Sequence, residues 1–279
     1  MKSLDFSDKL FKILIEVVPP AGPDADPLMQ RLKSLAALPF HAFSVATNPV
    51  AKPRMSAMAT CALTQQETNK PAILHCTTRD HNRISLQGLL WGAQALGIDT
   101  VLIATGDMVA LQDRHITTRV RDLDVFTLVA MARQSGLQTG VVIDPHPEAN
   151  GFKTAIRRLA QKIDAGAQFA VTQPIYDAET ADIMARATHA MGIPVIMGIL
   201  PLRTARHADF LHQKVAGIAV PRSLREQMHQ TDNAIKIGNQ NAREMLKTAL
   251  ERFAGACVMP PFDHYEVLED ILNFDFDTA

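Results

Sequence analysis

Eight short apolar segments, separated by helix-like stretches, predict that this chain folds as a single (β/α)8 (TIM) barrel. The segments are continuous apolar runs rather than alternating ones, which is typical of parallel strands covered on both faces. The chain has 279 residues, of which 47% are apolar and 20% charged, enough to build one core of barrel size. We therefore expect one domain over residues 1–279. The predicted strands are Ile13–Val18, Ala42–Ala46, Ala72–Cys76, Val101–Ala104, Gly140–Ile143, Phe169–Thr172, Pro194–Ile199 and Ala256–Met259.

The stretch Phe152–Ile163 shows the clearest helical pattern between the predicted strands. Six apolar residues lie 0, 3, 4, 7, 8 and 11 positions from its start and form one continuous stripe. A ninth apolar run, Ala216–Val220, is not counted as a strand because Pro221 follows it directly. An open doubly wound sheet, which would accommodate nine strands, is the alternative architecture.

Charge and composition exclude several classes of partner. Lys and Arg total 28 against 29 Asp and Glu, a formal net charge of −1, so the chain has no electrostatic footprint for nucleic acid or an anionic membrane. Aromatic residues make up 5%, which leaves few platforms for stacking bases. No apolar run approaches the ~20 residues that span a bilayer, and the first residues lack the apolar core of a signal peptide. We expect a soluble cytoplasmic protein that binds neither nucleic acid nor membrane.

Familiar metal, nucleotide and nucleophile motifs are missing from the sequence. Cys61, Cys76 and Cys257 are odd in number and widely spaced, which indicates reduced thiols rather than disulfides or a zinc site. The sequence shows no G-x-G-x-x-G after a strand, no Walker A motif, no H-E-x-x-H and no G-x-S-x-G. Asp144 and His146 are the best metal-like pair, but no third ligand lies near them, so we predict no metal site.

Glu16 lies inside the first predicted strand, towards the end where parallel barrels collect functional groups. Burial of a carboxyl group among apolar residues raises its pKa. Such a group suits a general acid that works near neutral pH. A structural ion pair with Lys or Arg is the alternative interpretation at this point.

Polar side chains also lie at or after the ends of other predicted strands. Asp107 follows the fourth strand and a glycine, where a helix or turn cap is the alternative role. His75 lies near the end of the third strand and Gln173 after the sixth, where a core histidine and a turn residue are the alternatives. Lys162 lies off the apolar stripe of its helix, where a solvated lysine is the common case. The shared position of most of these residues at one end of a barrel favours a site.

In their order along the chain, these fragments resemble the methylenetetrahydrofolate reductase family. Each fragment is short, so the resemblance depends on their order and spacing over nearly the whole chain. The stretches Arg79–Arg83 and 261–263 resemble the short bacterial and archaeal branch of that family. The matching fragments are Glu16-x-x-Pro19-Pro20, Asn48-Pro49, His75, Thr105-Gly106-Asp107, His146-Pro147-Glu148-Ala149, Lys162 with Asp164-Ala165-Gly166-Ala167, Thr172-Gln173, Gly198-Ile199-Leu200-Pro201 and Met259-Pro260-Pro261.

The resemblance implies a flavin-dependent enzyme that reduces 5,10-methylenetetrahydrofolate to 5-methyltetrahydrofolate by a two-stage, ping-pong hydride relay. NADH or NADPH would reduce the flavin, which is FAD or FMN, before the folate binds in its place. The resemblance makes Glu16 the general acid, Asp107 the group that stabilises the 5-iminium cation, and Gln173 a further folate contact. The implied flavin-binding residues are Thr47, His75, Thr105, Gly106, Asp107, His146, Arg158 and Lys162.

The sequence departs from the family pattern mainly on the ribityl, phosphate and adenosine side of the implied flavin. Thr105 stands where the family often has Arg, Thr47 lies one position after the usual Thr, and Arg158 replaces an Asn. No Phe follows Pro201, where the family often stacks an aromatic ring on nicotinamide and folate. The electron donor is therefore open between NADH, NADPH and a partner protein.

Two further functions stay open on the sequence alone. One is a folate-binding barrel subunit that is inert alone and is reduced by a partner flavoprotein or ferredoxin. The other is a pterin-dependent methyltransferase. A Schiff-base aldolase is disfavoured because the central predicted strands end without a lysine. The sequence leaves open a folate or a methanopterin-type substrate, and a monomer or a homo-oligomer.

Overall fold

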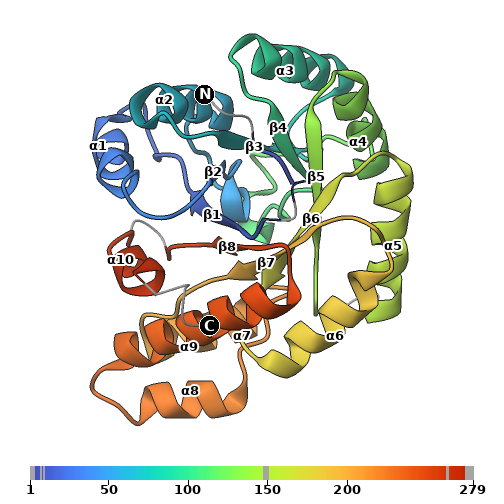
Figure 1. Cartoon of the computed structure of the whole chain (residues 1–279). Helices are drawn as coiled ribbons and strands as arrows, with labels where there is room; N and C mark the ends of the chain where they lie inside the picture. Colours follow the sequence, from blue (N-terminus) through green and yellow to red (C-terminus); the bar gives the residue numbers. More distant parts are fainter. Residues whose placement is uncertain (1–3, 7, 9, 147–150, 262–263, 274–279) are drawn as a thin grey trace.

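Eight parallel strands close into a barrel in the computed structural model, in the order β1 to β8 around the ring (Figure 1). The structure describes residues 4–6, 8, 10–146, 151–261 and 264–273. Every predicted strand is present within two residues at each end, so the (β/α)8 (TIM) barrel is confirmed and the open sheet is wrong. The strands are β1 (Lys12–Val17), β2 (Ala42–Val45), β3 (Ala72–Thr77), β4 (Thr100–Ala104), β5 (Gln138–Ile143), β6 (Phe169–Pro174), β7 (Val195–Ile199) and β8 (Gly255–Val258).

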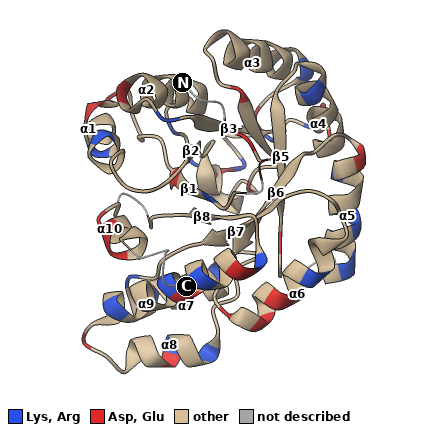
Figure 2. Ribbon diagram, viewed as in Figure 1, with Lys and Arg blue, Asp and Glu red and all other residues tan. Residues whose placement is uncertain are grey.

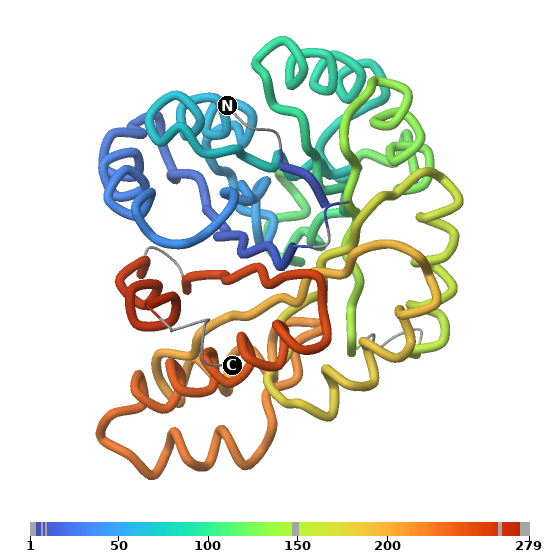
Figure 3. The backbone as a smooth tube through the Cα atoms, in the orientation of Figure 1, coloured from blue at the N-terminus to red at the C-terminus, as the bar shows by residue number. Residues whose placement is uncertain are grey.

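Helices follow the strands and cover the outside of the ring, as the tube in Figure 3 shows. The helix predicted from the stripe at 152–163 is confirmed as α5 (Phe152–Asp164). Two short 3₁₀ turns, Pro49–Ala51 and Leu111–Asp113, follow β2 and β4. The other helices are α1 (Asp26–Leu35), α2 (Ala57–Thr68), α3 (Arg83–Ala95), α4 (Val125–Gln134), α6 (Ala178–His189), α7 (Ala205–Lys214), α8 (Arg222–His229), α9 (Ala234–Arg252) and α10 (Val267–Leu272).

Short polar side chains fix the starts of five helices. In each case the residue before the helix accepts a hydrogen bond from the backbone amide three positions on, which satisfies an otherwise unpaired donor. This is the local reason why the chain turns from loop to helix at these points. The five capping residues are Asn82, Asp124, Asp177, Thr204 and Asn233.

The ninth apolar run, Ala216–Val220, is not a strand, as expected. It joins α7 to α8, and its Ile218 and Val220 are buried in a separate apolar cluster with Tyr176 and Leu202. The apolar character of this run therefore comes from packing between helices rather than from the sheet. Both α7 and α8 precede α9, so three helices separate β7 from β8.

The interior of the barrel is filled by side chains that alternate along the strands. Leu14, Ile73 and Phe169 belong to this inner cluster. Phe169 fits because β5 carries Gly140 opposite it, where a Cβ atom would lie only 2.2 Å from the Phe169 ring. Inward positions can thus be counted in steps of two from these residues.

The N-terminal segment before β1 closes the end of the barrel at which the strands begin. Leu4 and Phe6 join the inner cluster, and the Phe6 ring stacks on Phe169 with centroids 4.2 Å apart. Figure 2 shows charges of both signs spread over the outer helices. Among the described residues, no helix is both long and apolar enough to cross a membrane.

Candidate active site

The C-terminal ends of the strands, called the mouth here, carry the polar inner side chains. Glu16 lies two positions beyond the inward-facing Leu14, and His75 lies two positions beyond Ile73. Because side chains two apart on a strand share a face, Glu16 and His75 both face the barrel interior at the mouth. This is the end at which (β/α)8 barrels hold their functional groups.

Glu16 is partly protonated at neutral pH. Burial raises the pKa of its carboxyl group to about 7, and the negative charge of Asp107 adds to the increase. Within the described residues, no Lys or Arg forms an ion pair with Glu16, so the structural ion pair considered above finds no support. A carboxyl group that is half protonated at pH 7 can both release and regain a proton there.

Two small polar residues that the sequence reasoning missed lie beside Glu16 and His75. Ser44 is the register partner of Glu16 on the adjacent strand, and its Oγ lies 2.7 Å from Nε2 of His75. Cys257 on β8 hydrogen-bonds with Ser44, and burial raises its thiol pKa well above the usual value. Burial also lowers the pKa of His75 to about 4, so its ring is neutral at pH 7. Counting in steps of two from Ala42 would have found Ser44.

The Thr105-Gly106-Asp107 segment turns sharply at the end of β4. Gly106 has φ +85°, and a Cβ atom there would lie 3.0 Å from the Cβ of Arg79, so glycine suits both the conformation and the space. The Asp107 carboxylate accepts a hydrogen bond from the backbone amide of Val50, at 2.6 Å. The helix cap considered for Asp107 is wrong, because α4 is capped by Asp124.

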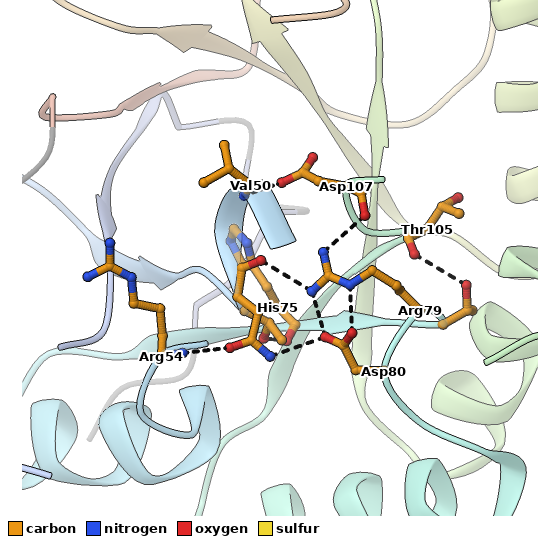
Figure 4. A network of polar contacts seen from close by, with 10 residues as sticks. Val50, Arg54, His75, Arg79, Asp80, Thr105 and Asp107 are labelled. Atoms are coloured by element: carbon orange, nitrogen blue, oxygen red, sulfur yellow. Dashed lines mark hydrogen bonds and ion pairs between the residues drawn. The ribbon is translucent and has the colours of Figure 1, made fainter. Parts of the chain in front are cut away.

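Contacts between the loops after β2, β3 and β4 bring several predicted residues together (Figure 4). The hydroxyl of Thr47 donates to the carbonyl of His75, and the hydroxyl of Thr78 donates to the carbonyl of Thr105 at 3.4 Å. Together with the effect of Asp107 on Glu16, these contacts place Glu16, Thr47, His75, Thr105, Gly106 and Asp107 in one region of the mouth.

Gln173 lies at an irregularity in the sheet. The register between β6 and β7 shifts between Val171 and Pro174, and the backbone amide of Gly198 donates to Oγ of Thr172 at 2.9 Å. A Cβ atom on Gly198 would lie 2.4 Å from the carbonyl oxygen of Thr172. The shift therefore positions Gln173 at the mouth on the β6 side, with no described contact to Glu16.

Lys162 is not the solvated lysine that its helical position suggested. Its ammonium group donates to the carbonyl of Val142 on β5 at 2.6 Å, and burial, together with the charge of Arg158, lowers its pKa to about 8. The guanidinium of Arg158 lies over the ring of Phe126, 5.4 Å from its centroid. Lys162 and Arg158 thus form a separate cationic pair beside β5, and no described contact joins them to Glu16.

The Asp144 and His146 pair has a backbone explanation. The amide of His146 donates to Oδ1 of Asp144 at 2.7 Å, as in a tight turn after a strand. The carboxylate of Asp144 also lies against Gly217 in the α7–α8 connection. The described residues contain no group of three His, Cys, Asp or Glu that could hold a metal ion. Residues 147–149 of the matching fragment lie outside the described residues, as do 262 and 263.

The fold and this mouth define a (β/α)8-barrel protein with two carboxyl groups of unlike environment at the C-terminal rim. The family model for methylenetetrahydrofolate reductase matches residues 2–257, so the chain belongs to the methylenetetrahydrofolate reductase family.

Individual relatives are distant. The chain is 27% identical over 187 residues to "Probable methylenetetrahydrofolate reductase (NADPH)" of Caenorhabditis elegans, which covers 64% of this chain and 28% of the relative. It is 24% identical over 181 residues to 5,10-methylenetetrahydrofolate reductase of Buchnera aphidicola, which covers 62% of this chain and 60% of that protein. The chain thus spans less than two thirds of the curated relatives it matches.

A solved structure with a similar fold comes from Clostridium thermocellum. That protein binds two copies of 5-methyl-5,6,7,8-tetrahydrofolic acid. It superposes with a TM-score of 0.72 at 13% identity and covers 96% of this chain and 95% of its own. At this identity the comparison supports the fold alone.

Proposed function

We propose that this protein is a flavin-dependent enzyme that reduces 5,10-methylenetetrahydrofolate to 5-methyltetrahydrofolate. The observation that carries the proposal is Glu16 at the mouth, whose pKa of about 7 depends on burial and on the charge of Asp107. The family match over residues 2–257 supplies the reaction class.

Residues at the mouth and beside β5 fit a flavin on three counts. Oγ1 of Thr77, an inner residue of β3, is buried without a hydrogen-bond partner, so a bound group could satisfy it. Val50 contacts Asp107 and Met108 follows it in the sequence, and these two apolar residues are 61% and 66% exposed. Their exposed side chains could pack against an aromatic ring. The cations of Lys162 and Arg158 suit a phosphate. When bound, the reduced flavin supplies the hydride.

Glu16 acts as the proton donor in this proposal. Its carboxyl O–H protonates a nitrogen of the imidazolidine ring of the substrate, and the carbon–nitrogen bond at that nitrogen breaks. The ring opens to a 5-iminium cation, and Glu16 is left as a carboxylate. Because its pKa is about 7, Glu16 regains a proton from water before the next turnover.

Asp107 supplies the negative charge that the cation requires. An oriented carboxylate near a developing positive charge stabilises it without reorganisation. The bond from the Val50 amide fixes one oxygen of Asp107. Gln173 on the β6 side would hold the folate ring, and the neutral His75, with Thr47, Thr105 and Gly106, would line the flavin. We place His146, Arg158 and Lys162 on the phosphate and adenosine side.

The electron donor is the open part of the proposal, and one observation favours a partner protein as the second candidate. Leu202, just after the β7 end, is 1% exposed. Its carbonyl lies so close to α9 that a Cβ atom on Gly238 would be 1.8 Å away. This segment therefore offers no exposed ring for a nicotinamide. A folate-binding subunit that is reduced by a flavoprotein or ferredoxin would not need one.

The purified full chain decides between these functions. We expect a yellow protein that releases FAD or FMN on denaturation, identified by mass, and that oxidises NADH or NADPH with menadione as acceptor. A yellow protein that is silent with both nucleotides but forms 5-methyltetrahydrofolate after chemical reduction would support the partner-dependent subunit. A colourless protein that transfers a methyl group to a thiol or corrinoid would overturn the proposal.

A further inference from the structure

Arg79 lies where three loops of the mouth meet, and it contacts all of them (Figure 4). Arg79 lies two residues after the end of β3 and is 2% exposed. Nη1 donates to the carbonyl of Asp107 at 3.1 Å, and Nη2 donates to the carbonyl of Asn48 at 3.2 Å. The guanidinium thus joins the loops after β2 and β4 to the end of β3.

The charge of Arg79 is balanced mainly by its neighbour Asp80, and Asp107 makes a smaller contribution. Nε and Nη2 each donate to one oxygen of Asp80, both at 2.6 Å, in a forked ion pair. This bond raises the pKa of Arg79, against the opposite effect of burial. The hydrogen bond from Arg79 to Asp107 goes to the main-chain carbonyl, the Asp107 charge acts on the guanidinium only through space, and the Asp107 carboxylate bonds to a neutral amide.

The loop after β2 requires such a restraint because its backbone is strained. Asn48, Val50 and Ala51 have φ values of 43°, 51° and 55°, a region that is costly for a β-branched residue such as Val50. The side chain of Asn48 adds two bonds that hold this conformation, a donor bond to Asp80 at 3.1 Å and an acceptor bond from the amide of Arg54 at 2.9 Å. The amide of Val50 is thereby presented to Asp107.

We propose that Arg79 is a positioning residue, which fixes Asp107 through its carbonyl and through the loop that holds Val50, while Asp80 neutralises the guanidinium. The Asp107 carboxylate is then held in place without being paired to a cation. The consequence for catalysis rests on the proposed function, but the positioning itself does not.

The pKa of Glu16 is a direct measure of this positioning. The titratable groups that face Glu16 among the described residues are Asp107, His75 and Cys257. The charge of Asp107 raises the pKa of Glu16, so any displacement of Asp107 away from Glu16 lowers it. A ¹³C carboxyl NMR titration of the purified full chain, with Glu16 assigned from Glu16→Gln, reads this value without flavin or folate.

The decisive variant is Arg79→Lys, which keeps the charge and removes the fork. We expect the pKa of Glu16 to fall, in the same direction as in Asp107→Asn and by no more. The pKa of Glu16 in the double variant Arg79→Lys/Asp107→Asn should equal that in Asp107→Asn alone, because both changes act through the Asp107 carboxylate. Hydrogen exchange of the Val50 amide should become several-fold faster in Arg79→Lys. Arg83→Lys, an exposed arginine on α3, is the matched control and should change neither value.

If Arg79→Lys fails to fold, Asp80→Glu gives the same reading, because it also preserves charge while it moves the partner of the fork. A Glu16 pKa equal to that of the wild type in a folded Arg79→Lys or Asp80→Glu protein overturns the positioning role. Additive shifts in the double variant overturn it as well. Because neither measurement needs flavin or folate, a failure of the proposed function leaves this test intact.

Discussion

The carboxylate of Asp107, on the loop after β4, raises the pKa of the Glu16 carboxyl group on β1 beyond the effect of burial. The two groups have unlike surroundings at one mouth, since Glu16 lies on an inner wall and Asp107 on an exposed loop held by the Val50 amide. This division is the one that a proton donor and an electrostatic stabiliser require.

Glu16→Gln should keep the flavin bound and reducible but slow folate reduction about 10²–10⁴-fold, because the amide cannot donate the required proton. Stopped-flow measurement of the two half-reactions checks this separately for each step. Glu226→Gln, an exposed carboxyl on α8, is the control. Near-normal folate reduction in Glu16→Gln would remove Glu16 from the acid role.

The pH dependence should follow the pKa of Glu16. The folate half-reaction needs the protonated form, so its rate should fall about tenfold per pH unit above pH 7. Stability should fall between about pH 4.5 and pH 7 and level off above pH 7, because over that range the folded state keeps the Glu16 proton while the unfolded state has lost it. The total loss is at most about 3 kcal/mol.

Glu16→Gln should therefore be more stable than the wild type at pH 8 and gain nothing at pH 4. Urea unfolding at the two pH values measures the difference. An equal change in stability at both pH values would show that folding does not raise the pKa of Glu16.

Asp107→Asn should raise the reduction potential of the bound flavin and slow folate reduction, because a negative charge disfavours the reduced flavin and favours the cation. Potentiometric titration and the folate half-reaction measure the two effects. Asp99→Asn, at the opposite end of β4, is the matched control. An unchanged potential together with an unchanged rate would place Asp107 outside the site.

Lys162→Met should weaken flavin binding about 10–100-fold if the ammonium group contacts a phosphate, as expected for a charge-assisted bond. The wild type should show the same weakening as the pH rises through 8, where Lys162 loses its charge. Fluorescence titration of the apoprotein gives the dissociation constants. Lys153→Met, an exposed lysine on the same helix, should bind flavin as the wild type does.

Gly217→Ala should destabilise the protein more than Gly192→Ala. Both glycines have positive φ, +83° and +70°, so the backbone cost of about 1–2 kcal/mol is shared. Only at Gly217 would the new Cβ lie 2.6 Å from the carboxylate of Asp144. Denaturant unfolding of the two variants isolates this contact, and equal losses would contradict it.

The barrel could be predicted from the sequence because each strand is a short, continuous apolar run, which can be recognised without knowing which strands lie next to it. Glu16 could be singled out for a similar reason, since a carboxyl group in such a run is conspicuous. The bond from Val50 to Asp107 joins residues 57 positions apart and exists only once the ring is closed. The sequence marks Arg79 only as part of a family fragment, because its contacts to Asp107 and Asn48 form only in the closed ring. The inward positions of Ser44, Thr77 and Cys257 likewise depend on the register of the strands.

The stack of Phe6 on Phe169 closes the N-terminal end of the barrel. Phe6 and Phe169 occupy that end, and both carboxyl groups lie at the opposite end, the mouth. In the proposed reaction, the hydride donor and the folate would each have to reach the flavin from the mouth. The closed N-terminal end of the barrel would then by itself require the two reactants to bind one after the other.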